Sequence, residues 1–494
     1  MQTTTYKGTD KVLFGFILSV LTFWLFANSM MNVSPVMTEA LGMDANTMNI
    51  AVSLAALFSG IFIVVIGGLA DSIGRVKTFR IGLYLAVAGS LLVGLSPSAD
   101  MSTVPPTENV YALPMLLIGR ALQGLSAAFI MPTSLGMIKI FWEGKERQRA
   151  ISLWSIGTFG GSGLSSFIGG SIASSFIGWR GIFILAIIVA IIALYLTKEL
   201  PENKREGAGK YKIDWGGIIM FMIAMVALQI FINKGNDFGW TSTITIVLIA
   251  ITLVFGYLFV FIENKVPYAF VDFGLFKNKV FTGATLANFF INGTSGILIV
   301  SPALMQKAAQ FSSFQTGLLT LGFAIVVILF IRVGEKLLQK FGAKKPIIWG
   351  ALIISVAIIL LMQTYLMTAQ YVVLAIIAYC LFGLGLAFFA TPATDAALSN
   401  LPESQAGSGA GIFKMASSLG TSLGVAISAG INSAVSSGEP IAWLSNIITF
   451  VGRQDNVHFR QGAMLGFSFC LLLAVLVIVT VVALIPDKKK AETK

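Results

Sequence analysis

The run Gly67-Gly68-Leu69-Ala70-Asp71-Ser72-Ile73-Gly74-Arg75-Val76-Lys77 joins two apolar segments that are each long enough to cross a bilayer. Its glycines favour close helix approach and a sharp turn of the backbone. Asp71 and Arg75 are four residues apart at a helix end, a spacing that favours an ion pair or a contact with a helix terminus. A solvated hairpin with incidental charges is the alternative. Gly67, Asp71, Gly74 and Arg75 are therefore candidate functional residues in a turn between two membrane helices.

The composition indicates a membrane protein. The chain has 494 residues, of which 56% are hydrophobic and only 11% are charged. Soluble domains carry about 25% charged residues, so this chain has too little charge to cover a water-facing surface. A net charge of +11 would suggest nucleic acid in a soluble protein, but here Lys and Arg fall between apolar runs. The two cysteines lie inside apolar runs and there is one histidine, so we expect no disulfide framework, no metal site and no cofactor.

Apolar runs of about 20 residues, the length that crosses a bilayer, recur along the whole chain. The first, about residues 12–31, is longer than the apolar core of a secretory signal and is interpreted as a span. Thirteen further runs bring the expected number of spans to fourteen. They lie near residues 48–69, 79–96, 112–133, 150–173, 180–198, 214–233, 241–262, 281–304, 313–333, 346–366, 370–393, 408–430 and 461–485.

The distribution of Lys and Arg predicts the orientation of these spans. An even number of spans places both termini on the same side of the membrane. If that side is the cytoplasm, 26 of the 33 Lys and Arg residues lie in inner segments, five lie in outer loops, and Arg120 and Lys414 lie within spans. This excess is what the positive-inside rule requires. The sequence therefore predicts cytoplasmic termini and a lipid bilayer around the chain.

Interrupted, charged segments after the sixth and eighth spans divide the chain into three expected parts. Residues 1–200 are expected to form an N-terminal six-helix bundle, residues 201–279 a linker with two additional transmembrane helices, and residues 280–494 a C-terminal six-helix bundle. The longest outer loop, about residues 432–460, is expected to carry a short surface helix around Trp443.

The two six-span parts share short matches in the same order. Val33-Ser34-Pro35 matches Val300-Ser301-Pro302, Pro132 matches Pro392, and the turn around Gly74 has a weaker counterpart around Gly342. Each match is short, but their common order and similar spacing predict a parallel internal repeat. Transporters are often built from such repeats.

Two stretches of this sequence resemble the signatures of a known family. Residues 67–77 are similar to the cytoplasmic signature of the major facilitator superfamily, and the run Leu116-Leu117-Ile118-Gly119-Arg120-Ala121-Leu122-Gln123-Gly124 resembles its span-four signature. The fourteen-span layout resembles the QacA-like drug:proton antiporter family. Residues 23–27, 51–54 and 154–157 are similar to the NorB/NorC type of quinolone-resistance pump of Gram-positive bacteria.

This resemblance implies an all-α membrane fold with 14 transmembrane helices, as two six-helix bundles plus two linker helices. It implies that Gly67, Asp71, Gly74 and Arg75 form a cytoplasmic gate, although Ser72 stands where a basic residue is common. It also implies a cell-membrane transporter of a Gram-positive bacterium, driven by the transmembrane proton gradient and active as a monomer.

Two basic residues lie inside expected spans. A charge at the middle of a span costs about 2.5–3.5 kcal/mol on insertion scales, so Arg120 must face a partner or a cavity. In the resembling family this arginine belongs to the proton-coupling machinery, and purely structural pairing is the alternative. Lys414 lies within about two turns of the cytoplasmic end of span thirteen. It either snorkels to the surface or lines the cavity.

Proton antiport requires a group that binds and releases a proton, and a desolvated carboxylate suits this task. QacA-like proteins carry an aspartate in span one, where this chain has Ala27. Among the Asp and Glu residues we single out Asp71, at the rim of a span, and Asp395, near the inner end of span twelve. Asp395 is the candidate proton carrier, and a charge at the cytoplasmic surface is the alternative.

Small, aromatic and amide residues complete the candidate site. Span five contains Gly157, Gly161, Gly169 and Gly170 and resembles the antiporter motif of drug exporters, but Ser165-Ser166 replaces the Gly-Pro pair of that motif. Ordinary helix packing is the alternative for these glycines. Aromatic, Met and amide side chains make adaptable cavity walls. The candidates that line a substrate cavity are Trp24, Asn28, Asn32, Trp154, Phe159, Asn288, Phe289, Asn292, Phe388, Phe413 and Lys414.

The sequence thus predicts a proton-coupled multidrug efflux antiporter that works by alternating access. Its expected substrates are amphipathic drugs, including quinolones, dyes and quaternary ammonium compounds, and its other partners are protons. A narrow exporter of an endogenous metabolite or lipid-linked compound is the alternative. An enzyme would need a cluster of His, Asp or Cys, a channel a repeated polar ring, and a nucleotide-driven pump a phosphate-binding loop; none of these patterns occurs in the sequence.

Overall fold

The computed structural model describes residues 6–43, 45–100, 102, 109–202, 214–239, 241–266, 269, 271, 273–311, 313–436 and 438–487. These residues form helices and no β-strand, which confirms the all-α class. Up to residue 200 the elements are α1 (Asp10–Leu21), η1 (Thr22–Ala27), α2 (Asn28–Leu41), α3 (Ala45–Ile73), α4 (Arg75–Gly94), α5 (Ala112–Phe141), α6 (Gly144–Ser155), η2 (Ile156–Gly160), α7 (Gly161–Ala173) and α8 (Arg180–Leu196). Residues 203–213 of the expected linker lie outside the described part of the chain.

Two longer helices follow, α9 (Trp215–Phe238) and α10 (Thr243–Glu263). The remaining elements are η3 (Phe273–Lys277), α11 (Lys279–Gly293), η4 (Thr294–Gly296), α12 (Ile297–Ala309), α13 (Ser313–Phe341), α14 (Lys344–Leu361), α15 (Thr368–Ser399), η5 (Glu403–Gln405), α16 (Ala406–Ser436), α17 (Ala442–Ile447) and α18 (Val457–Leu484). Of the short elements, η1 and η2 are π-helical turns that continue directly into α2 and α7.

The helices coincide with the expected spans. Within the described residues, eleven are long and apolar enough to cross a membrane. The other three expected spans fall on helical segments that do not meet this criterion over their described residues: α6, η2 and α7 together, α8, and α9. The chain is therefore an all-helical, multi-pass membrane protein, and the number fourteen stays a prediction.

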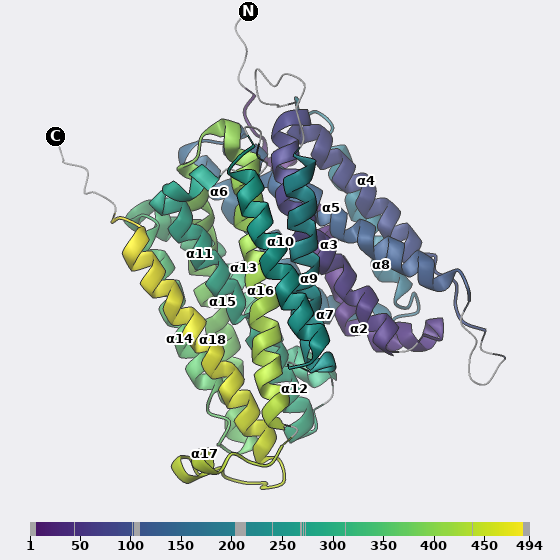
Figure 1. Ribbon diagram of the computed structural model, residues 1–494, viewed down its shortest axis with the longest axis vertical. Coiled ribbons are helices and arrows are strands. Elements are labelled where there is room, and N and C mark those ends of the chain that lie inside the picture. Colours follow the sequence, from purple (N-terminus) through teal and green to yellow (C-terminus); the bar gives the residue numbers. More distant parts are fainter. Residues whose placement is uncertain are drawn as a thin grey trace, which may run out of the picture. The chain divides into compact units, whose positions relative to one another are not determined.

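The chain separates by its internal contacts into two units. The first comprises Met1–Met222, Gly256–Phe273 and Leu401–Met415, and the second comprises Ile223–Phe255, Gly274–Asn400 and Ala416–Lys494. In the first unit, α5 packs mainly on α3 and α4, and α8 packs on α1 and α4 (Figure 1). In the second, α15 packs mainly on α13 and α14, and α18 packs on α11 and α14. The same neighbours recur in the same chain order, which supports the expected repeat; the three-part domain division stays a prediction.

Reciprocal glycine pairs hold the central helices of each unit close together. A Cβ added to Gly89 on α4 would lie 2.7 Å from the carbonyl oxygen of Gly119 on α5, and one added to Gly119 would lie 2.9 Å from that of Gly89. In the second unit, Gly350 on α14 and Gly385 on α15 stand in the same relation, at 2.6 Å each way. The two pairs occupy equivalent helices, so this close crossing is a further feature of the repeat.

The turns that precede α4 and α14 also correspond. Gly74 has a φ of +117° and Gly342 a φ of +77°, a backbone region that residues with a Cβ rarely adopt. Their positions before α4 and α14 agree with the match seen in the sequence. The acidic residue of the first turn has no counterpart in the second, where Glu335 lies a turn earlier on α13 and pairs with Arg332 at 2.5 Å.

The surface of the described chain is apolar where lipid is expected. Only 11% of the apolar stretch of α10 is buried, and Leu253 and Tyr257 on that helix are 67% and 69% exposed. A water-soluble protein rarely exposes such large apolar surfaces. In the second unit, α17 contains Trp443, which confirms the expected surface helix, and lies beside the end of α18 that is remote from the carboxyl terminus (Figure 1).

The glycine crossing of the second unit leads to a prediction about stability. Gly385→Ala forces the new methyl group against the Gly350 carbonyl, so we expect a loss of about 1–3 kcal/mol from overpacking. Gly256→Ala is the matched control, because a Cβ there meets no atom within 4 Å. The midpoint of thermal unfolding in detergent should fall for Gly385→Ala and stay the same or rise for Gly256→Ala. Equal midpoints for the two variants would contradict the tight crossing.

Candidate functional site

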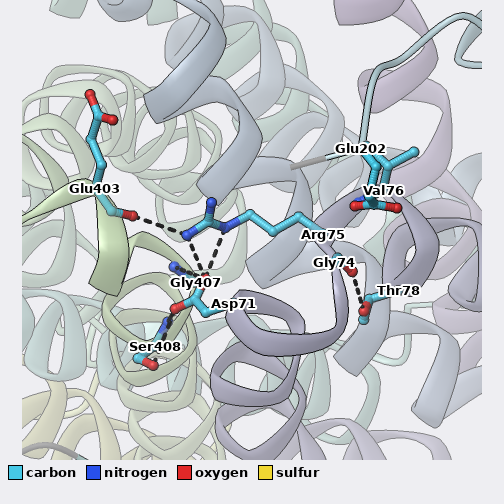
Figure 2. A network of polar contacts seen from close by, with 9 residues as sticks. All are labelled: Asp71, Gly74, Arg75, Val76, Thr78, Glu202, Glu403, Gly407 and Ser408. Atoms are coloured by element: carbon cyan, nitrogen blue, oxygen red, sulfur yellow. Dashed lines mark hydrogen bonds and ion pairs between the residues drawn. The ribbon is translucent and has the colours of Figure 1, made fainter. Parts of the chain in front are cut away.

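The turn between α3 and α4 reaches the beginning of α16 through Asp71 (Figure 2). The carboxylate of Asp71 accepts hydrogen bonds of 3.0 Å from the backbone N–H groups of Gly407 and Ser408, and a longer one of 3.3 Å from the Ser408 hydroxyl. The first N–H groups of a helix have no partner within the helix, and the helix dipole favours an anion there. Asp71 therefore caps a helix that lies 336 residues away in the sequence.

Arg75 completes this contact. Its Nε and Nη2 atoms lie 2.8 Å and 2.7 Å from the Asp71 carboxylate, and Nη2 also donates to the carbonyl of Glu403 at 3.0 Å (Figure 2). Asp71 is 4% exposed and Arg75 is 2% exposed, so the pair is almost completely removed from solvent. Lys139 on α5 donates to the Leu401 carbonyl in the same connection before α16. All these residues belong to the first unit.

The glycines of the turn make this approach possible. A Cβ on Gly67 would lie 2.7 Å from the Gly407 carbonyl oxygen and 3.3 Å from the Cα of Gly411, so α3 and the start of α16 touch backbone to backbone. Gly74 takes the positive φ that redirects the chain between α3 and α4. The four residues expected at the gate are thus brought to one place.

A second carboxylate, missed in the sequence, supports the turn from the other side. Glu202, which follows α8, lies beside Val76 (Figure 2) and accepts hydrogen bonds from the backbone N–H groups of Val76 and Lys77 at 3.0 Å and 2.9 Å. It therefore caps α4 as Asp71 caps α16. Nearby, Lys11 donates to Glu199 at 3.0 Å, a hydrogen bond that lowers the pKa of the Glu199 carboxyl group. No local pattern marks Glu202, because the helix it caps is more than a hundred residues earlier.

Arg120 lies in the interior of the first unit and is 3% exposed. Its guanidinium donates to the main-chain carbonyls of Ala27, Ala51 and Val52 at 2.9–3.0 Å, and to the side-chain oxygen of Gln123 at 2.7 Å. These acceptors come from η1, α3 and α5. Among the described residues Arg120 forms no ion pair, so its charge is compensated only by neutral dipoles. The expectation that Arg120 has buried partners is met, and its role in proton coupling is not thereby tested.

The small residues of η2 and α7 pack against α1 and α2. A Cβ on Gly157 would lie 2.6 Å from Val20, one on Gly161 would lie 2.8 Å from Leu21, and one on Gly169 would lie 2.6 Å from Ser29. Ser29 also donates to the carbonyl of Ser165 at 2.8 Å. Gly170 differs, because a Cβ there meets no atom within 4 Å.

The two π-helical turns mark the same contact. η1 contains Trp24, η2 contains Gly157 and Phe159, and the two turns touch. Such turns often occur at functional sites, and they distort a helix as a proline would. A proline would have indicated a distorted helix here, but the sequence has none in this part of span five. The sequence therefore did not predict the π turns.

The expected cavity residues fall into two groups. In the first unit, Trp24, Asn28 and Phe159 are partly buried, whereas Trp154 is 0% and Phe413 1% exposed. The ammonium group of Lys414 lies 4.5 Å from the centre of the Trp154 ring and the residue is 7% exposed, so Lys414 does not snorkel. Asn32 lies on α2, and its side chain is outside the described residues.

The second group belongs to the second unit. Asn288 on α11 donates to Ser417 on α16 at 2.6 Å and accepts from Asn292 at 2.9 Å, so these amides form a polar chain. Phe289 and Phe388 are partly buried. Asp395, the candidate proton carrier, is 7% exposed and accepts a hydrogen bond of 3.0 Å from Ser399. Whether the two groups line one cavity stays a prediction.

Among the described residues, three further carboxylates are buried that the sequence did not single out. Asp214 and Glu263, at 5% and 4% exposure, approach each other beside Gly217, where Asp214 caps the beginning of α9. Glu335, also 4% exposed, pairs with Arg332. The position of Asp214 directly before an apolar helix is the typical signal of a capping residue.

Comparisons with known proteins agree with the geometry. The family model for the Major Facilitator Superfamily matches residues 12–425 and 281–494. Quinolone resistance protein NorB of Staphylococcus aureus strain MRSA252 is 47% identical over 416 residues, 84% of this chain and 87% of that protein. NorB of strain COL is 43% identical over 487 residues, 99% and 98% of the two chains. The solved structure of the proton:xylose symporter XylE shares the fold, with a TM-score of 0.66 at 17% identity over 97% of this chain and 96% of that one.

The packing of α7 provides a prediction with an adjacent control. Gly169→Ala places a methyl group against Ser29, so α7 must move away from α2 and the midpoint of thermal unfolding should fall. Gly170→Ala adds the same group in open space and should leave the midpoint unchanged or raise it, because Ala favours helix by about 1 kcal/mol over Gly. Unfolding is measured on the purified protein in detergent. A larger loss for Gly170→Ala would contradict this account of the α7 face.

Proposed function

The chain belongs to the major facilitator superfamily, and on this premise we propose that it is a proton-coupled exporter of amphipathic drugs. The observation that carries the proposal is its similarity to quinolone resistance protein NorB over 99% of the chain, a range that includes every residue of the candidate site. Membership of a transporter superfamily confirms that the chain is a membrane transporter rather than an enzyme. Quinolones, dyes and quaternary ammonium compounds are the proposed substrates.

Asp71 and Arg75 act as a latch on the cytoplasmic side in this proposal. The Asp71 carboxylate binds the N–H groups at the beginning of α16, and Arg75 binds the carboxylate and the preceding connection. These bonds involve charged groups and can be exchanged for bonds to water at a net cost of about 1.5–3 kcal/mol each. The latch therefore closes the cytoplasmic side strongly enough to populate one state and weakly enough to release it.

The proposed topology has fourteen crossings with both termini in the cytoplasm. The charge count supports it, because 26 of the 33 Lys and Arg residues then lie on the inner side. Three further helical segments, α6 to α7, α8 and α9, complete the fourteen with the eleven helices that are long and apolar enough. The proposed location is the cell membrane of a Gram-positive bacterium, and the proposed active form is a monomer.

Proton coupling is assigned to Arg120 and Asp395. A guanidinium keeps its proton in proteins, so Arg120 contributes a fixed positive charge and Asp395 is the group that binds and releases the proton. The absence of a carboxylate at Ala27, where related exporters carry one, leaves this task to an acid elsewhere. The burial of Asp395, which is 7% exposed, supports the assignment, because buried ionisable residues inside membrane proteins often belong to proton pathways.

Proton antiport is tested with drug accumulation in everted vesicles, with and without an imposed pH gradient. We expect uptake of a quinolone and of a cationic dye when the vesicle lumen is acidic, and a loss of both when a protonophore removes the gradient. Vesicles without the protein are the control. Uptake that ignores the gradient would exclude proton antiport, and the absence of any drug uptake would favour a narrow exporter of an endogenous compound.

The latch and the buried arginine are tested by substitution. Asp71→Asn places an amide NH₂ against the N–H groups of α16 and leaves Arg75 without a counter-charge, so extrusion should fall to background. Arg120→Ala leaves three carbonyls without their donor and should have the same effect. Asp487→Asn is the control, because that aspartate is exposed and its contact with Lys344 is long, at 3.5 Å. Extrusion is measured in intact cells at equal membrane levels of each variant, and full extrusion by either variant would remove its assigned role.

A further inference from the structure

The ammonium group of Lys414 is buried without an oxygen acceptor. Lys414 is 7% exposed, and its Nζ lies 4.5 Å from the centre of the Trp154 ring and 5.9 Å from that of Phe413. Within the described part of the chain it forms no hydrogen bond and no ion pair. An ammonium has three N–H donors, and none of the three has an acceptor among the described residues.

This arrangement is unfavourable unless another group joins it. Removing an ammonium from water costs several kcal/mol even after the protein relaxes, and a cation–π contact returns about 2 kcal/mol when it is desolvated. The other buried cations of the first unit have oxygen acceptors: Arg75 binds Asp71, Arg120 binds carbonyls, and Lys139 binds the Leu401 carbonyl. Lys414 is the exception among these four, and an ionisable group of this kind inside a membrane protein points to a ligand.

The surroundings of Lys414 are rigid and aromatic. The Trp154 indole N–H donates to Ser134 at 3.0 Å, which fixes the ring on which the ammonium rests. Phe413 is 1% exposed and packs on the same side chain. Lys414 also lies on α16 seven residues after Gly407, about two helical turns beyond the Asp71 contact. The latch contact and this ammonium therefore lie on the same helix.

We propose that Lys414 binds the carboxylate of the transported compound, and that aromatic carboxylic acids, including zwitterions, are the preferred class of substrate. A carboxylate would accept the three N–H donors and neutralise the charge, and the planar ring of the compound would pack against Trp154 and Phe413. Charge-assisted hydrogen bonds of this type are about twice as strong as neutral ones. This inference rests on the proposed export function and adds the chemical class of the substrate.

Lys414→Met is the informative variant, with a quinolone carboxylic acid and its methyl ester as a matched pair of probes. Met keeps the length and apolar character of the side chain, and replacing an unpaired buried charge by an apolar group does not destabilise a protein. We expect an efflux rate about tenfold lower for the acid and little changed for the ester and for a cationic dye. Lys414→Arg, which keeps the charge, should retain most of the transport of the acid.

Lys307→Met is the control, because Lys307 also lies over an aromatic ring, that of Phe459 at 5.4 Å, but is exposed. It should transport the acid and the ester as the unchanged protein does. Equal loss of all probes in Lys414→Met would show that Lys414 serves coupling or folding and would overturn the inference, as would unchanged transport of the acid.

The failure of this inference is separable from that of the export function. An unchanged protein that exports the dye but never the acid is an exporter without a carboxylate site. An unchanged protein that exports no probe contradicts the proposed function itself. Direct binding of the acid to purified protein in detergent, followed by its own fluorescence, gives a reading that does not depend on proton coupling, and Lys414→Met should weaken that binding about tenfold.

Discussion

A charge that leaves water must find acceptors in the protein, and the first unit is built around this constraint. Arg75 finds a carboxylate and a carbonyl, Arg120 finds three carbonyls and an amide oxygen, and Lys139 finds one carbonyl. Apart from the bonds of Arg75 to Asp71 and of Arg120 to Gln123, these bonds join elements that are far apart in the chain. Burying the cations therefore also defines which helices lie together. Lys414 is the exception, because its ammonium group contacts aromatic rings and has no oxygen acceptor among the described residues.

Main-chain carbonyl groups in a helix are surrounded by side chains and engaged in the helix's own hydrogen bonds. A buried cation therefore reaches them only where helices approach closely. The glycines supply this close approach. Gly67 brings α3 onto the backbone of Gly407, and Gly157, Gly161 and Gly169 bring α7 and η2 onto the first helix pair. The reciprocal pairs of Gly89 with Gly119 and Gly350 with Gly385 do the same within each unit. Small residues let membrane helices gain dispersion energy that lipid does not offer, and here they also bring polar groups within reach of each other.

Helix beginnings are the second means of holding charge. Asp71, at the turn between α3 and α4, caps the beginning of α16. The helix that follows the same turn, α4, is itself capped by Glu202. Both contacts use N–H groups that the helices leave unpaired in any case. They require little apolar burial, which means that they can separate without exposing a core. Such polar contacts suit the gate proposed for this turn, whereas the glycine crossings suit parts that stay together.

The sequence by itself determined the membrane class, the helical spans, the family, and the local chemistry of the turn. These features are written in short-range patterns: apolar runs, charge asymmetry, and the spacing of Gly67, Asp71, Gly74 and Arg75. The tertiary structure alone decided the partners of these residues. Asp71 and Gly407, Glu202 and Val76, and Lys414 and Trp154 are distant in sequence, and no local pattern relates them. The π turns at η1 and η2 were equally hidden, because they depend on how two helices pack rather than on a proline. Short-range patterns define where a helix can form, and only the packed chain brings a buried charge to its acceptor.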